Sequence, residues 1–139
     1  HLSYFAERVH EMLGWHAEIY CDSRHLGELE TALCRLPAVS IDHLGLSKKG
    51  LPLLYRLVEK GVRVKATGFG RVDFAVSQVL RRLYDINPQA LMFGTDLPST
   101  RSPRPFNPVD IEIIGNTLGD DGARRVLWEN AAEFYRLPN

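Results

Sequence analysis

The chain has 139 residues, of which 45% are hydrophobic and 24% charged, so it is long enough to bury the core of one globular domain. Lysine plus arginine number 17, as do aspartate plus glutamate, and the formal net charge is zero. This balance argues against nucleic acid or an anionic membrane as the main partner, because both select a basic surface. The sequence has no apolar run of membrane-spanning length and does not open on a signal-peptide pattern. We therefore expect a soluble, cytoplasmic protein in which Cys21 and Cys34 are reduced thiols.

Hydrophobic periodicity and turn residues predict helices and strands in alternation. In chain order we expect a helix over 3–13, a strand over 15–20, a helix from 22 or 23 to 36, a strand over 38–42, a helix over 52–60, a strand over 62–66, a helix over 72–84, a strand over 90–94, a proline-rich loop over 99–108, and helices over 109–118 and 120–135. Glycines between 119 and 122 separate the last two helices.

Such an alternation is typical of βα units in a parallel sheet, and no linker divides residues 1–139, so we expect one α/β domain. Two architectures satisfy the pattern. One is an open, doubly wound sheet of the flavodoxin type. The other is half of a (β/α)8 barrel, because a whole barrel needs about 250 residues. Both place functional groups at the carboxyl ends of the strands.

His43 and Asp96 follow two strands that we expect to be neighbours. His43 comes directly after the strand over 38–42, where an imidazole can bind a metal or polarise a carbonyl group. Asp96 comes after the strand over 90–94, where a carboxylate can act as a general base toward water or as a metal ligand. Each residue also has an ordinary structural explanation, a hydrogen-bonded turn histidine for the first and an N-cap or Asx turn for the second.

Other polar side chains lie in or beside the predicted strands. Arg71 can bind a substrate carboxylate through two parallel hydrogen bonds, or be solvated. Tyr20 can hydrogen-bond a ligand, or pack at the edge of the core. Lys65 shares one side of its strand with Arg63, and the ordinary expectation for a lysine there is a carboxylate partner within the sheet. His16 stands at the opposite end of its strand, where we expect a structural role.

Three segments carry a resemblance to a known family: Val39-Ser40-Ile41-Asp42-His43-Leu44-Gly45, Leu91-Met92-Phe93-Gly94-Thr95-Asp96-Leu97-Pro98, and Asn130-Ala131-Ala132-Glu133-Phe134-Tyr135. Together they resemble the amidohydrolase superfamily, in the branch of TIM-barrel hydrolases that includes amidohydrolase-2 proteins and 2-pyrone-4,6-dicarboxylate lactonase. Their order and spacing are similar to strand six, strand eight and the terminal helix of that family, and Val64-Lys65-Ala66-Thr67-Gly68 resembles its strand seven. The resemblance covers essentially the whole chain. It implies parallel βα repeats that form the C-terminal half, strands five to eight, of a (β/α)8 TIM barrel.

By this resemblance Asp96 is the carboxylate that activates the attacking water, and His43 binds a metal or helps polarise the substrate carbonyl. Metal-binding members of the family carry a histidine at the tip of strand five, where this chain has Tyr20-Cys21-Asp22. Two alternatives follow. A divalent metal such as zinc is held by His43 and Asp96, or the site works without a metal, as the lactonase branch is thought to, and Tyr20 and Arg71 contact the substrate.

The resemblance implies a hydrolase that acts on a small carboxylated lactone or ester through attack of water on a carbonyl. One alternative is a metal-dependent non-oxidative decarboxylase of the same superfamily, and another is a non-catalytic flavodoxin-like binding module. We expect a small-molecule substrate. We also expect that the chain is part of a longer protein and inactive alone, or that two copies complete a barrel as a homo-oligomer, because an isolated half barrel exposes two sheet edges.

Overall fold

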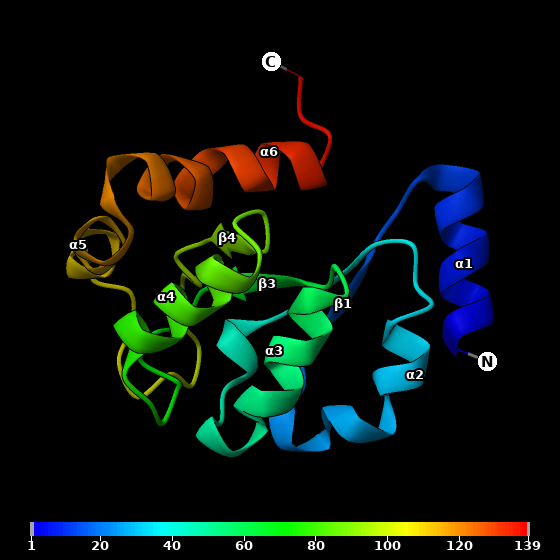
Figure 1. The fold of residues 1–139 in the computed structure, drawn as a ribbon, viewed down its shortest axis with the longest axis horizontal. Helices are drawn as coiled ribbons and strands as arrows, with labels where there is room; N and C mark the ends of the chain where they lie inside the picture. Colours follow the sequence, from blue (N-terminus) through cyan, green and yellow to red (C-terminus); the bar gives the residue numbers. More distant parts are fainter. Residues whose placement is uncertain (1, 139) are drawn as a thin grey trace.

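The computed structural model describes residues 2–138, which form a parallel β-sheet with helices packed around it (Figure 1). The strands are β1 (Ala17–Ile19), β2 (Val39–Ile41), β3 (Arg63–Ala66) and β4 (Leu91–Phe93). The helices are α1 (Leu2–Leu13), α2 (Glu30–Leu33), α3 (Leu51–Glu59), α4 (Val76–Ile86), α5 (Val109–Arg124) and α6 (Asn130–Phe134). Short 3₁₀ turns cover Ser23–Glu28, His43–Gly45 and Lys48–Gly50, and a π-helical turn covers Arg125–Glu129.

Each strand pairs in parallel with the strand that follows it in the sequence, so the order across the sheet is β1-β2-β3-β4. This confirms the prediction of parallel βα repeats. A flavodoxin-like sheet reverses its strand order at a switch point, and the sheet formed by the described residues has no such reversal. The sequential order is the one found in the wall of a (β/α)8 barrel.

The prediction that His43 and Asp96 follow neighbouring strands is wrong. His43 follows β2 and Asp96 follows β4, whereas β3 pairs with both of these strands and lies between them. The reason is the sequential strand order, which puts the third strand of the chain in the third place of the sheet. As a consequence, the segment that leaves β3 reaches the space between the two side chains.

One face of the sheet is apolar and packs against α3 and α4. Ile41, Val64 and Leu91 from the strands are fully buried and belong to one hydrophobic cluster. The helices contribute fully buried leucines to the same cluster, namely Leu54, Leu57, Leu80 and Leu83. This burial holds the strands in place, and at about 1.5–3 kcal/mol for each large apolar side chain it is the main stabilising contribution.

The opposite face of the sheet carries polar side chains, and we call it the polar face. It is formed by Glu18, Ser40, Asp42, Arg63 and Lys65. These residues share one side because side chains alternate along a strand and because Ser40 is in register with both Glu18 and Arg63. Lys65 Nζ lies 2.6 Å from Glu18 Oε2 and 3.4 Å from Asp42 Oδ1. The expectation that Lys65 pairs with a carboxylate in the sheet is therefore confirmed.

Glu18 is the centre of this network. The hydroxyl group of Tyr135 donates a hydrogen bond to Glu18 Oε1 at 2.9 Å, and His16 Nε2 lies 2.9 Å from the same oxygen. Burial raises the pKa of Glu18, but the hydrogen bonds from Lys65, His16 and Tyr135 outweigh burial and lower the pKa to about 2. The ring of His16 also packs against Phe134 and Tyr135, so its expected structural role is confirmed.

The helix expected from residue 22 or 23 to 36 is interrupted. The chain forms a 3₁₀ turn over Ser23–Glu28 and then the four-residue α2. The first turn is fixed by tertiary bonds, because Ser23 Oγ donates to the carbonyl oxygen of Ser47 at 2.9 Å and Ser47 Oγ donates to Asp22 Oδ2 at 2.6 Å. Gly27 adds to the interruption, since glycine has a low helix propensity.

The helix expected over 72–84 begins four residues later, at Val76. The preceding residues are held by the loop after β2 instead: the backbone N–H of Lys48 donates to Asp73 Oδ1 at 2.6 Å, and the N–H of Asp73 donates to the carbonyl oxygen of Leu46 at 3.4 Å. The helix ends at Ile86, two residues beyond the predicted end and directly before Asn87 and Pro88. Tertiary contacts thus shorten the helix at its N-terminal end, because Asp73 accepts a hydrogen bond from Lys48 and the residue before the helix, Ala75, provides no side-chain cap.

The chain changes direction between the start of α5 and α6, as Figure 1 shows, and the kink lies at Gly119. Gly119 has φ +72° and ψ 177°, values outside the helical region, so the predicted break is confirmed. The buried amide of Asn130 then anchors the last helix, because its Nδ2 donates to the carbonyl oxygens of Pro88 and Leu91 at 2.8 and 2.9 Å. Among the described residues, no helix combines the length and the apolar character needed to cross a membrane.

Candidate active site

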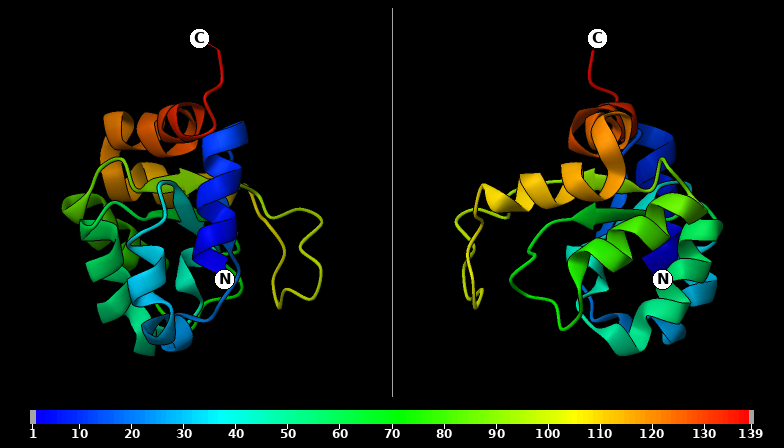
Figure 2. Two further views of the ribbon diagram at one scale, coloured as in Figure 1. Left: turned by 90° about the vertical axis from the view of Figure 1, so that its right-hand side faces the viewer. Right: turned by 60° about the vertical axis from the view of Figure 1, so that its left-hand side comes forward.

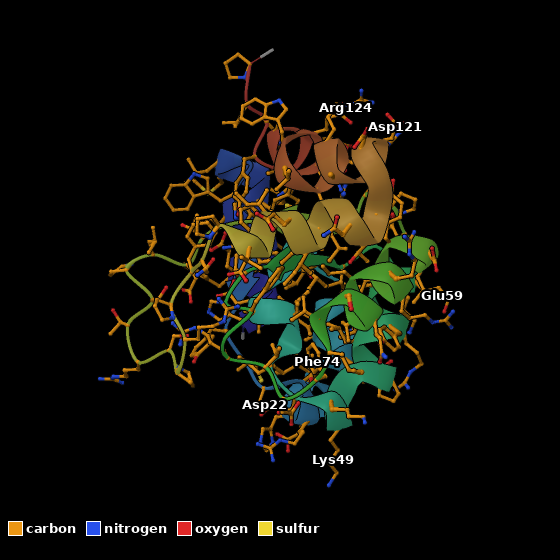
Figure 3. All side chains as sticks on the ribbon, turned by 90° about the vertical axis from the view of Figure 1, so that its left-hand side faces the viewer. Asp22, Lys49, Glu59, Phe74, Asp121 and Arg124 are labelled. Atoms are coloured by element: carbon orange, nitrogen blue, oxygen red, sulfur yellow. The ribbon has the colours of Figure 1, made fainter. Side chains whose placement is uncertain are left out.

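The carboxyl ends of the strands carry the candidate site, and the loop over 94–108 extends from this end of the sheet (Figure 2). Figure 3 shows Asp22 and Lys49 together at one end of the molecule, whereas Glu59, at the end of α3, lies well apart from them. Asp22 follows β1 and Lys49 precedes α3, so both come from loops at the carboxyl ends of strands. The parallel sheet therefore gathers its loops at one end, where ligands bind in α/β proteins.

His43 and Asp96 approach one another at this end of the sheet. His43 Nε2 lies 4.0 Å from Asp96 Oδ1, and the two side chains are 14% and 17% exposed. Both residues have a left-handed backbone, with φ +52° and +59°. Such a conformation is uncommon for residues other than glycine, and strain of this kind gathers at functional sites. The structure thus brings the two proposed catalytic side chains together at the carboxyl ends of the strands.

Arg71 holds the other oxygen of the same carboxylate. Its Nε donates to Asp96 Oδ2 at 2.6 Å, and its Nη2 donates to the carbonyl oxygen of Thr100 at 3.0 Å. The side chain is only 13% exposed. Arg71 is therefore no solvated surface arginine, which was the alternative interpretation of the sequence. It ties the loop over 94–108 to the site and places a cation beside the proposed base.

Tyr20 completes the group of sequence-predicted residues. Its ring meets the imidazole of His43 edge to face, with 5.5 Å between the ring centroids and an interplanar angle of 84°. The side chain is largely exposed. With Arg71, Ser47 and Arg101, it lines a pocket of about 310 Å³ beside the site. A small ligand bound there would meet a phenol, a hydroxyl and two guanidinium groups, together with the carboxylates of Asp22 and Asp73.

Thr67 also belongs to this site, although sequence reasoning did not select it. Its Oγ1 lies 2.8 Å from His43 Nδ1, and the side chain is buried. Gly68 makes this approach possible, because a Cβ atom there would lie 2.8 Å from both His43 Nδ1 and Arg71 Cδ. The signal in the sequence was the position of Thr67, directly after the last residue of β3, where a parallel strand presents its side chains to the site.

Burial decides the charge state of His43. Desolvation lowers the pKa of its imidazole, and the nearby cations Arg71 and Lys65 lower it further, whereas Asp96 and Asp42 act in the opposite direction. The net shift is downward, so the imidazole is neutral at neutral pH. A neutral imidazole can donate one hydrogen bond and accept another, which suits it to polarise a carbonyl group.

The described residues supply too few ligands at this site to hold a metal ion by themselves. His43 and Asp96 offer an imidazole nitrogen and a carboxylate oxygen, which are ordinary zinc ligands. Within residues 2–138 no group of three or more His, Cys, Asp or Glu side chains is arranged to hold a metal. His43 and Asp96 would hold such an ion only with ligands from elsewhere, and the ion would polarise the substrate carbonyl.

Several solved structures have the same fold as this chain over about half of their own length. An amidohydrolase of Burkholderia multivorans with bound zinc has a TM-score of 0.76 and 19% identity, and the match covers 98% of this chain and 57% of that one. Amidohydrolase 2 of Bifidobacterium longum subsp. infantis has a TM-score of 0.71 and 20% identity, with coverage of 95% and 54%. The chain therefore spans about half the length of the structures it matches.

A third structure comes from a protein of Pseudomonas putida that has been suggested to be a 2-pyrone-4,6-dicarboxylic acid hydrolase. It has a TM-score of 0.70 and 24% identity, and the match covers 94% of this chain and 55% of that one. No curated protein matches the chain. The amidohydrolase family profile matches residues 2–137, nearly the whole sequence. The chain thus belongs to the amidohydrolase family.

Proposed function

We propose that this chain is the C-terminal half, strands five to eight, of a barrel-shaped hydrolase that opens a small carboxylated lactone or ester. Water attacks the carbonyl carbon, and Asp96 accepts the proton of that water as general base. The bond between the carbonyl carbon and the ring or ester oxygen then breaks, and Asp96 returns the proton to the departing alkoxide oxygen. His43 donates a hydrogen bond to the carbonyl oxygen, on which negative charge develops. Tyr20 and Arg71 contact the substrate, and the guanidinium group of Arg71 pairs with its carboxylate.

The observation that carries this proposal is the convergence of Asp96 and His43, 4.0 Å apart and mostly buried, with Arg71 bonded to the carboxylate. A base, a hydrogen-bond donor and a cation for an anionic substrate thus share one site. Two further findings support a hydrolase of this type: the amidohydrolase family match and the likeness to the Pseudomonas putida protein.

The proposal can be tested by mutagenesis and kinetics in the complete natural protein. Replacing Asp96 with Asn removes the base and keeps the shape of the side chain, so we expect kcat for carboxylated lactones to fall roughly 10²–10⁴-fold. The melting temperature should change little, because the amide oxygen can still accept the hydrogen bond from Arg71. Asp121→Asn is the matched control, since the Asp121 side chain is 89% exposed and lies in α5. Normal turnover by Asp96→Asn would overturn the proposal.

A metal-dependent non-oxidative decarboxylase is the second candidate, favoured by the zinc ion bound to the Burkholderia multivorans amidohydrolase. In that case His43 and Asp96 are metal ligands, joined by ligands from outside the described residues. The products separate the candidates: ring opening with uptake of water indicates the lactonase, and release of carbon dioxide that depends on added zinc indicates the decarboxylase.

A further inference from the structure

We propose that Thr67 is a positioning residue whose hydroxyl group donates a hydrogen bond to Nδ1 of His43. This bond keeps the imidazole proton on Nε2, the nitrogen that faces Asp96. This proposal deepens the proposed function, and its kinetic consequence rests on that function. The tautomer itself does not, because it follows from contacts within this chain. Each ring nitrogen of His43 has a defined neighbour: Thr67 Oγ1 is within hydrogen-bond distance of Nδ1, and the carboxylate of Asp96 lies near Nε2.

The direction of the hydrogen bond follows from the number of protons available. A threonine hydroxyl has one proton to donate, and a neutral imidazole has one N–H and one acceptor nitrogen. Within residues 2–138 Thr67 Oγ1 has no hydrogen-bond partner other than His43 Nδ1. If Nδ1 carried the proton, the buried hydroxyl would have no acceptor in this part of the chain, and an unsatisfied buried donor is costly. Donation from Thr67 to Nδ1 satisfies both groups.

The other side of the ring leads to the same tautomer. Nε2 lies 4.0 Å from a carboxylate oxygen of Asp96, and a carboxylate attracts an N–H group and repels a nitrogen lone pair. Asp96 itself is held by Arg71, so it has a defined position relative to the ring. Thr67 and Asp96 therefore act in the same direction, one from each side of the imidazole.

The turn after β3 is built to keep this contact. Gly68 has φ +61°, and any side chain there would displace the imidazole or the stem of Arg71, because its Cβ atom would lie 2.8 Å from each of them. The methyl group of Thr67 packs on Gly94, where an added Cβ would lie 3.0 Å from Cγ2. Both the hydroxyl and the methyl of Thr67 thus have fixed surroundings, so the hydroxyl cannot turn away by rotation of the side chain alone.

The consequence is chemical. With the proton on Nε2, His43 presents a hydrogen-bond donor on the side of the ring where Asp96 lies, and such a donor is suited to a carbonyl oxygen that gains negative charge. In this tautomer Nε2 has no free electron pair for a metal ion or for a proton from water. The hydrogen bond from Thr67 thereby gives the two side chains different roles: His43 polarises the substrate carbonyl, and Asp96 acts as the general base.

The test is ¹⁵N NMR of the natural protein labelled at histidine, with His43→Asn used to identify the His43 signals among those of the other histidines. We expect a protonated Nε2 and an unprotonated, hydrogen-bonded Nδ1. Thr67→Ser keeps the hydroxyl and should preserve these signals. Thr67→Val keeps the methyl packing, and the Nδ1 signal should move to that of a free acceptor while the Nδ1–H tautomer becomes about tenfold more populated, in line with the loss of one buried hydrogen bond.

Kinetics supply the second readout. Thr67→Val should lower kcat for the lactone roughly tenfold with little change in KM, since the lost interaction acts on the transition state, and Thr67→Ser should restore it. Thr31→Val, on the exposed surface of α2, should change neither readout. A wild-type ring protonated at Nδ1, or a Thr67→Val ring with wild-type signals, overturns the inference. If no variant hydrolyses lactones while the NMR result holds, the proposed function fails and the assignment of the tautomer stands.

Discussion

At the scale of single residues, the polar face shows how a charged network is kept within a parallel sheet. Lys65 forms ion pairs with Glu18 and Asp42, and Glu18 is also hydrogen-bonded to His16 and Tyr135. Each of these charges has at least one opposite partner, which a group removed from water requires. The network also joins the C-terminal segment to β1 and β3. Its stability should therefore depend on the ionisation of Glu18.

We predict that this dependence appears in acid. The pKa of Glu18 is about 2 in the folded chain, against its ordinary value of 4.5, so its contribution to stability is present above pH 4.5 and is lost as the pH falls toward 2. Glu18→Gln cannot titrate and should lose less stability over this interval. Because Glu18 is partly exposed, we expect a difference on the order of 1 kcal/mol.

Urea unfolding of the two proteins at several pH values between 5 and 2 measures the difference. Asp22 also has a pKa of about 2 and loses its own contribution in the same interval, but it does so equally in wild type and Glu18→Gln. The comparison thus isolates Glu18. Parallel stability curves for the two proteins would mean that the network does not depend on the charge of Glu18.

At the scale of elements, the strands and the starts of α1, α3 and α5 were predictable, whereas the starts of α2 and α4 were not. β2 and β4 are short apolar runs bounded by turn residues, so their places follow from local sequence. The start of α4 depends on Asp73, whose bonds reach the loop after β2. The role of Thr67 likewise depends on His43, 24 residues away in the chain. Contacts between distant segments are what the sequence pattern does not contain.

The anchoring of α6 gives a prediction at this scale. The Asn130 side chain is buried and donates to the carbonyl oxygens of Pro88, before β4, and of Leu91, at its start. Asn130→Ala removes both hydrogen bonds and leaves the two acceptors unsatisfied, so we expect a loss of roughly 2–3 kcal/mol in the free energy of unfolding. Asn116→Ala, at an exposed position of α5, is the control and should cost little. Equal stabilities of the two variants, measured by urea unfolding, would contradict this role.

At the scale of the whole molecule, the sheet ends in two strands that each have one neighbour. β1 pairs only with β2, and β4 only with β3, among the described residues. α1, which precedes β1, exposes large apolar side chains, with Phe5 67% and Met12 71% exposed. An unpaired strand edge with apolar surface nearby is a template for further pairing. This surface agrees with the proposal that the chain is half of a barrel, since a closed barrel has no edges.

Amide hydrogen exchange tests the half-barrel proposal through two adjacent residues of β1. The N–H of Ala17 donates to the carbonyl oxygen of Ala38, which directly precedes β2, whereas the N–H of Glu18 points to the opposite side, because successive amides of a strand alternate. In the 139-residue chain we expect Ala17 to be protected and Glu18 to exchange faster. In the complete natural protein the preceding strand of the barrel should pair with this edge and protect Glu18 as well. If Glu18 exchanges equally fast in both forms, no strand covers β1, and the half-barrel proposal fails.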